Sequence, residues 1–211
     1  MMFALELVGI AAFAVSGAMV ALEKQADIFG VILLAVVTAL GGGVTRDLLL
    51  GNTPPVMFTS YLYVAVAVLF ALALFLDAYI RREKYIEHSH KLDAINNIFD
   101  AAGLAVFTVS GMNMAMNRGD YNAFLLITVG VVTGVGGGVL RDMMLGTMAK
   151  LLRKRIYAVA SVLGAVLYYL LLHLGAGQIL SALSGMVFIF ALRVLATVYK
   201  WNLPAVRIAK S

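Results

Sequence analysis

Two segments of the sequence place an arginine and an aspartate side by side, with the arginine three residues after the last of three consecutive glycines. They read GGGVTRD at residues 41–47 and GGGVLRD at residues 136–142, and both lie inside long apolar stretches. Ionisable side chains in such surroundings are costly and normally face a protein interior or a water-filled path. Glycine carbonyls and hydroxyls suit a partly dehydrated monovalent cation. These segments therefore favour the binding and passage of an ion or small solute.

Other polar residues in the apolar stretches complete two sets of candidates. The residues expected to line the path are Gly41, Gly42, Gly43, Gly136, Gly137, Gly138, Thr38, Thr133, Ser16 and Ser110. The charges expected to flank it are Arg46, Asp47, Arg141, Asp142, Glu6 and Asp100. An enzyme is disfavoured, because no histidine lies near a serine nucleophile along the apolar stretches and no cysteine is present. Neither a tight metal site nor a cofactor is expected.

The composition explains why these residues need special surroundings. Of 211 residues, 63% are hydrophobic and 13% are charged, and the mean hydropathy is +0.97. These values exclude a soluble globular domain and indicate an integral membrane protein. The formal net charge of +5 does not indicate a nucleic-acid partner, because no basic and aromatic reading module accompanies it.

Seven apolar stretches are long enough to cross about 30 Å of hydrocarbon as helices. They cover residues 3–22, 28–50, 57–79, 95–116, 122–145, 156–174 and 177–199. The links between them are short and polar. The longest link, residues 81–93, contains His88 and His90 and is interpreted as a solvated loop. We therefore expect a single all-α membrane domain, residues 1–211, with a short tail at residues 200–211.

Lysine and arginine set the expected orientation. Twelve of the 16 basic residues fall in the first, third and fifth links and the C-terminal tail, whereas Arg118 alone lies on the opposite face. By the positive-inside rule, the N-terminus is outside and the C-terminus is cytoplasmic in a multi-pass protein of the inner (plasma) membrane. Topology accounts for the basic links, and anionic lipid bound to them is a second interpretation.

The sequence contains an internal repeat. Residues 9–22 align without gaps with residues 103–116 at seven of 14 identical positions, and residues 38–51 align with 133–146 at nine of 14. The chain is therefore a duplicated three-helix unit, at residues 3–79 and 95–174, followed by a seventh helix. Because each unit has three crossings, the second copy starts on the opposite side of the membrane. The repeats are thus inverted, as in many transporters and pores.

The glycine triplets allow two interpretations. Glycine has a weak helix preference, so each triplet can break or kink its helix and expose carbonyls to a cavity at mid-membrane. Alternatively, the glycines allow close helix packing, as the small-residue stripe Gly130, Gly134 and Gly138 indicates. The recurrence of the triplet before Arg-Asp favours a break that also packs closely.

The buried charges need partners. Neighbouring residues on a helix do not face each other, so each arginine of the two motifs is expected to pair with another helix. Glu6 and Asp100 occupy equivalent places in the two units. The predicted pairs are Glu6 with Arg46 and Asp100 with Arg141, and favourable charge at a helix start is the alternative role of the two acids. Arg193, in the seventh stretch, is expected to extend to the cytoplasmic interface.

Seven helices, two inverted three-helix units and the doubled GGGxxRD motif resemble the prokaryotic branch of the trimeric intracellular cation (TRIC) channel family. The resemblance covers essentially the whole chain. It implies a homotrimer in which each protomer has its own path, lined by the kinked second and fifth helices and conducting K⁺ with some Na⁺. It also implies that the glycine triplets are the kinks and the Arg-Asp pairs the flanking charges. Membrane lipids are the other expected partners.

Two other functions compete with the channel. Some bacterial members of the same sequence family have been regarded as carriers of small amino acids, glycine in particular. A half-helix starting after each triplet would offer a positive dipole end to a carboxylate. Asp47 and Asp142, in its first turn, already compensate that end, which favours a cation path. A structural protein without transport would leave the paired breaks without a purpose.

Overall fold

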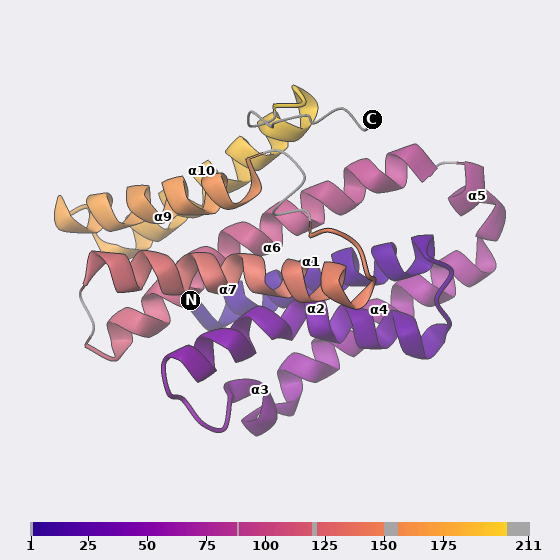
Figure 1. The fold of residues 1–211 in the computed structure, drawn as a ribbon, viewed down its shortest axis with the longest axis horizontal. Helices are drawn as coiled ribbons and strands as arrows, with labels where there is room; N and C mark the ends of the chain where they lie inside the picture. The colour runs from indigo at the N-terminus through magenta and orange to yellow at the C-terminus, as the bar shows by residue number, and fades with distance from the viewer. Residues whose placement is uncertain (1, 88, 120–121, 150–155, 202–211) are drawn as a thin grey trace, which may run out of the picture.

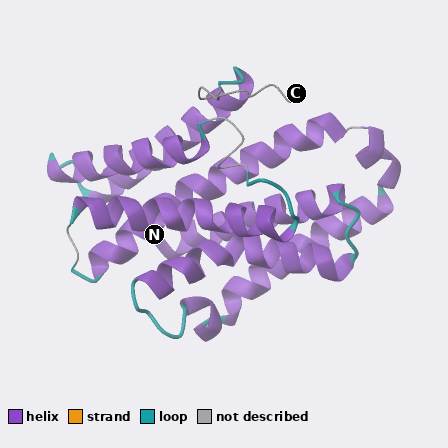
Figure 2. Ribbon diagram, in the orientation of Figure 1, coloured by secondary structure: helices purple, strands orange, loops and turns teal. Residues whose placement is uncertain are grey.

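The computed structural model describes residues 2–87, 89–119, 122–149 and 156–201 (Figure 1). Across these residues the regular structure is entirely helical (Figure 2). The helices are α1 (Met2–Glu23), α2 (Ile28–Leu49), α3 (Val56–Thr59), α4 (Tyr61–Ile80), α5 (Arg82–Glu87), α6 (Ser89–Asn117), α7 (Ala123–Met144), α9 (Tyr157–His173) and α10 (Gln178–Val198). Six are long and apolar enough to cross a membrane, and α9 is a shorter apolar helix. The predicted all-α membrane fold with seven spans is confirmed.

Two boundaries differ from the predicted spans. The third span begins with a separate short helix, α3, because Ser60 has an extended backbone that interrupts the chain before α4. The Asp47 carboxylate accepts the Val56 backbone N–H at 2.9 Å, which fixes the start of α3. The prediction of a loop at residues 81–93 was wrong, since α5 and the first turns of α6 occupy most of it. That segment contains no glycine or proline to stop a helix, and His88 lies outside the described residues.

The two units occupy equivalent places around a shared centre. In the first unit α4 packs on α1 and α2, and in the second unit α9 packs on α6 and α7. The units meet where α1 packs against α6 and α2 packs against α7. The seventh span, α10, packs against α6 and α9, and it runs beside α9 along one edge of the bundle (Figure 1).

The crossing of α2 and α7 explains two of the glycines. A Cβ on Gly42 would overlap the carbonyl oxygen of Thr133, and a Cβ on Gly137 would overlap the carbonyl oxygen of Thr38. Such reciprocal contacts arise where two helices cross about a local twofold axis. The equivalence of the two repeats is therefore visible at the glycines themselves, and the close approach of the two backbones requires residues without a side chain.

The helices are not interrupted at the triplets. Both α2 and α7 continue as α-helix through the glycines and for a further turn beyond them. The predicted break was wrong, and the packing alternative accounts for Gly42 and Gly137. Glycine lowers helix preference by only about 1 kcal/mol, and the tight crossing holds each helix in place. Consequently Asp47 and Asp142 lie in the last turn of a continuous helix, not in the first turn of a new one.

An aromatic pair marks the other contact between the units. Phe13 of α1 and Phe107 of α6 stack with ring centroids 5.3 Å apart and planes inclined by 18°. A Cβ on Gly103 would overlap the Phe13 ring, and one on Gly9 would lie 3.2 Å from the Phe107 ring. The four residues are equivalent in pairs under the sequence repeat, so each glycine makes room for the phenylalanine of the other unit.

Candidate functional site

One group of charged residues joins the ends of α1, α2 and α4. The Arg46 cluster consists of Glu6, Arg46, Asp47, Tyr63 and Ser110. Arg46 donates from Nε to Asp47 Oδ1 at 2.9 Å and from Nη1 to Glu6 Oε1 at 3.3 Å. Tyr63 donates to Glu6 Oε2 at 3.4 Å, and Ser110 of α6 donates to Glu6 Oε1. The Glu6 carboxylate on α1 therefore binds side chains of three other helices, α2, α4 and α6.

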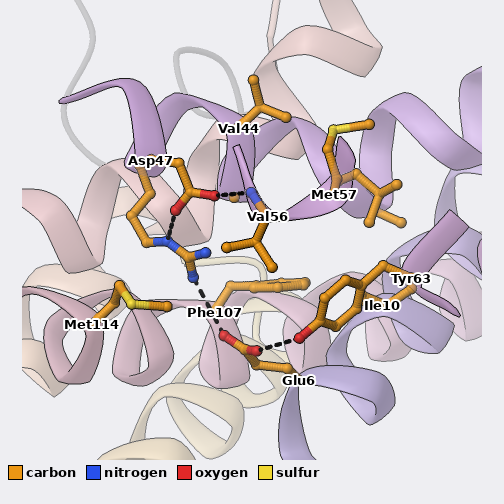
Figure 3. A pocket seen from close by; sticks show the side chains of 13 residues that line it. Glu6, Ile10, Val44, Asp47, Val56, Met57, Tyr63, Phe107 and Met114 are labelled. Carbon is orange, nitrogen blue, oxygen red and sulfur yellow. Dashed lines mark hydrogen bonds and ion pairs between the residues drawn. The ribbon is translucent and has the colours of Figure 1, made fainter. Parts of the chain in front are cut away.

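The Arg46 cluster opens onto a small pocket (Figure 3). The pocket has a cavity volume of about 60 Å³, room for one or two water molecules. The Glu6 side chain is 16% exposed, the largest exposed fraction among the paired charges of the cluster. Apart from the charged residues and Tyr63, the lining is mainly apolar and consists of Ile10, Ala39, Leu40, Gly43, Val44, Val56, Met57, Phe107 and Met114.

The equivalent group in the second unit is sealed. The Arg141 cluster consists of Ser16, Asp100, Arg141, Asp142, Tyr157 and Arg193. Arg141 donates from Nε to Asp142 Oδ1 and from Nη1 to Asp100 Oδ1, both at 2.9 Å. Arg141 Nη1 also donates to Ser16 Oγ of the first unit at 2.9 Å. The side chains of Arg141 and Asp100 are completely buried.

The clusters contain the predicted pairs and correct two other predictions. The pairs Glu6–Arg46 and Asp100–Arg141 are both present. However, each arginine also binds the aspartate that follows it, because the long side chain curls back along its own helix. Arg193 does not extend to the interface as predicted. It is 3% exposed, lies 3.7 Å from Asp100 Oδ2 and places its guanidinium carbon 4.5 Å from the centre of the Tyr157 ring.

A second pocket lies at the end of the bundle nearer the Arg141 cluster. It has a cavity volume of about 590 Å³ between the ends of α1 and α4, α5 and the start of α6. Asn96 lines this pocket and is itself 5% exposed. Asn96 Oδ1 accepts a 2.6 Å hydrogen bond from Ser16. The hydrogen-bonded side chains of Asn96 and Ser16 therefore lie between the pocket and Arg141.

The predicted path hydroxyls are packed inside the protein. Thr38 donates to the Leu34 carbonyl and Thr133 to the Val129 carbonyl, both at 2.6 Å, so these hydroxyls bond to their own helices. A Cβ on Gly17 or Gly111 would lie 2.6 or 2.5 Å from the nearest of these threonine hydroxyls. Ser16 and Ser110 instead join the opposite unit's charge cluster, as described above.

Of the six triplet glycines, only Gly43 lines either pocket. Gly41 and Gly136 lie within the α2–α7 crossing, where their added Cβ atoms would approach Leu140 and Gly42, respectively. Gly138 lies beside Tyr157, whose hydroxyl would be 3.0 Å from an added Cβ. The structure therefore places Gly41, Gly42, Gly136 and Gly137 in the helix crossing, whereas Gly43 faces the Arg46 cluster and Gly138 faces the Arg141 cluster.

The motif search missed the two tyrosines that complete the clusters. Tyr63 and Tyr157 lie in the first turns of α4 and α9, and each contacts a charged residue of the cluster in its own unit. Extending the repeat to the third helix of each unit aligns residues 63–71 with residues 157–165, and both segments begin with tyrosine. That alignment is the signal that could have identified them. In the described residues, no group of three histidine or acidic side chains is placed to hold a metal ion.

Comparison with known proteins agrees with this duplicated architecture. The family model described as glycine transporter matches residues 3–78 and residues 97–173, one segment for each three-helix unit. The UPF0126 membrane protein YvgT of Bacillus subtilis is 36% identical over 95% of this chain and 94% of that protein.

Solved structures share the whole fold. A TRIC trimeric intracellular cation channel orthologue from Rhodobacter sphaeroides is 34% identical, with a TM-score of 0.84 over 95% of this chain and 98% of that one. A structure described as the basis for conductance through TRIC cation channels is 34% identical, with a TM-score of 0.83 over 98% of both chains. The chain therefore belongs to the TRIC/UPF0126 family of multi-pass membrane proteins, as the doubled motif indicated.

Proposed function

We propose that this protein is a channel for monovalent cations, K⁺ and also Na⁺, with one path through each protomer of a homotrimer. The observation that carries the proposal is the pair of charge clusters at opposite ends of the α2–α7 crossing, with a pocket near each. Charged groups buried in a membrane protein without a catalytic arrangement are typical of an ion path. The similarity to solved TRIC cation channels supports the same function.

The proposed path connects the two pockets through the shared centre of the units. From the pocket at Glu6 it passes Phe107 and Phe13, and then reaches Ser16 and Asn96 at the other pocket. The stacked phenylalanines form an apolar constriction, which excludes water and ions until the helices move. The structure thus corresponds to a closed path in this proposal. The glycine triplets contribute by letting α2 and α7 shift at their crossing, and Thr38 and Thr133 by packing against it.

The remaining features of the proposal follow from the family and from the basic links. The protein lies in the inner (plasma) membrane with its N-terminus outside and its C-terminus in the cytoplasm. It requires no resident cofactor, since the cation is the cargo, and it is not an enzyme, as its channel relatives are not. Anionic lipid binding at the basic links is included, although several of those residues, among them residues 150–155, lie outside the described part of the chain.

A carrier of glycine is the second candidate, because the family model carries that description. The structure weakens the physical argument for it. Continuous α2 and α7 offer no free helix start at mid-membrane to hold a carboxylate. The 60 Å³ pocket at the Arg46 cluster is also small for an amino acid, so of the two pockets only the 590 Å³ one has room for it.

Recording from purified protein in planar bilayers separates the two candidates. With K⁺ as the only permeant cation, the channel predicts discrete single-channel openings and no saturable uptake of labelled glycine into proteoliposomes. The control is a bilayer that contains an equal amount of heat-denatured protein. Saturable glycine uptake without any openings would contradict the channel.

A further inference from the structure

The two clusters differ in net charge. The Arg46 cluster contains two carboxylates and one arginine, so it carries one excess negative charge. The Arg141 cluster also contains two carboxylates, but Arg193 supplies a second arginine, so the formal charges of its described residues balance. Among the described residues, the lining of the pocket at the Arg46 cluster includes no other basic side chain.

This difference arises from the one span that is not duplicated. Arg193 belongs to α10, which packs on the second unit, and the described part of the chain has no equivalent helix on the first unit. The guanidinium of Arg193 lies over the ring of Tyr157 and approaches Asp100. The equivalent tyrosine, Tyr63, donates a hydrogen bond to Glu6 instead.

We propose that Arg193 makes the cation path electrically asymmetric by neutralising the Arg141 cluster. This inference rests on the proposed channel function. An excess negative charge beside a pocket of low polarity concentrates cations at that end. The Arg141 cluster at the other end is neutral, and the charged residues that line the pocket near it, Glu23, Arg82 and Asp93, are exposed to water, which weakens their field. K⁺ current that enters from the Arg46 end therefore exceeds the reverse current at equal and opposite voltage. Arg193 thus acts by changing the electrostatic potential along the path and need not contact the ion.

The test measures the ratio of the two currents in symmetric K⁺ solutions for wild type, Arg193→Gln and Arg193→Lys. Sidedness is fixed in a Tyr61→Cys background, since Tyr61 is 87% exposed at the Arg46 end and the chain has no other cysteine. A membrane-impermeant thiol biotin added to one chamber, with streptavidin, reports which end faces it. We expect a wild-type ratio of about two or more at low salt, falling toward one at about 1 M salt because the charges are then screened.

The Arg193→Gln variant leaves both clusters with one excess negative charge, so its current ratio should fall toward one at low salt. The Arg193→Lys variant retains the positive charge and should keep most of the wild-type ratio. If Arg193→Gln opens normally with an unchanged current ratio, the inference is wrong while the channel function stands. If Arg193→Lys lowers the current ratio as much as Arg193→Gln does, the inference is also wrong, because Arg193 then has a packing role. An absence of openings in wild type would instead contradict the proposed function, and the inference with it.

Discussion

The Arg46 and Arg141 clusters are copies of one arrangement, yet one is open and the other is sealed. Glu6 is 16% exposed at its side chain and faces a pocket, whereas its counterpart Asp100 is completely buried. The repeated residues supply the same arginine, acid, serine and tyrosine to both. The seal comes from Arg193 on α10, which lies outside the repeat, and from Asn96 near the start of α6, a position at which the two units differ. Duplication therefore provides the framework, and the added helix together with such differences gives its two ends different properties.

The largest expected difference concerns the two acids themselves. Asp100→Asn removes the carboxylate between two buried arginines, and breaking a buried ion pair typically destabilises by about 3–5 kcal/mol. Glu6→Gln should destabilise by only about 1 kcal/mol, because water reaches the site and Arg46 keeps Asp47 as its partner. Denaturant unfolding of both variants in detergent, followed by circular dichroism, measures the two losses. Equal losses would contradict the distinction between an open and a sealed cluster.

Substitutions in the α2–α7 crossing should change the free energy of unfolding nearly as much, and the position of the glycine decides whether the change destabilises or stabilises the protein. Gly42→Ala places a Cβ against the Thr133 carbonyl and forces α2 and α7 apart, which should destabilise by about 3 kcal/mol. Gly43→Ala is the matched control in the same triplet. Its added Cβ would have Arg46 Nη2, 3.9 Å away, as its nearest neighbour, so the better helix preference of alanine should stabilise by up to about 1 kcal/mol. The same unfolding experiment measures both changes, and similar destabilisation by the two variants would refute the crossing as the reason for the triplet.

Chemical access provides a third comparison between the ends. Tyr63→Cys and Tyr157→Cys introduce single thiols at equivalent positions of the two repeats. Tyr63 lines the small pocket, whereas Tyr157 is 3% exposed. We expect a small water-soluble maleimide to label the Tyr63→Cys variant at least about tenfold faster, because only the thiolate in contact with water reacts. Gel filtration shows that both variants are folded, and faster labelling at position 157 would reverse the assignment of the open end.

The smallest effect is expected at the second pocket. Burial and a 3.1 Å hydrogen bond to Asp77 raise the pKa of Tyr85 from its ordinary value of 10.0 to about 12. A pKa raised in the folded state stabilises the protein below the unfolded pKa, and the stabilisation is lost as pH rises from about 10 to about 12. Tyr85→Phe should remove this component. The difference in melting temperature between wild type and variant should then shrink across that pH range, and a constant difference would argue against the Asp77 contact.

The repeat made much of the molecule predictable from its sequence. Seven spans follow from apolar length, and the pairs Glu6–Arg46 and Asp100–Arg141 follow from matching one unit to the other. The continuity of α2 and α7 could not be predicted, because a glycine's local preference is weaker than the packing of two helices at their crossing. The position of Arg193 was predicted wrongly for a related reason. A long side chain near a helix end can reach either the interface or a buried carboxylate, and only the position of α10 against α6 decides between them.

The central claim is that the pocket at the Arg46 cluster belongs to a cation path, and a single current measurement tests it directly. K⁺ currents are recorded through the Tyr63→Cys variant before and after a membrane-impermeant, positively charged thiol reagent is added to the Arg46 side, with cysteine-free wild type as the control. If the pocket lies on the path, the reagent reduces the variant's single-channel current and leaves wild type unchanged, because it adds a positive charge and bulk beside Glu6. Full labelling, verified by mass spectrometry, with an unchanged current would contradict the account.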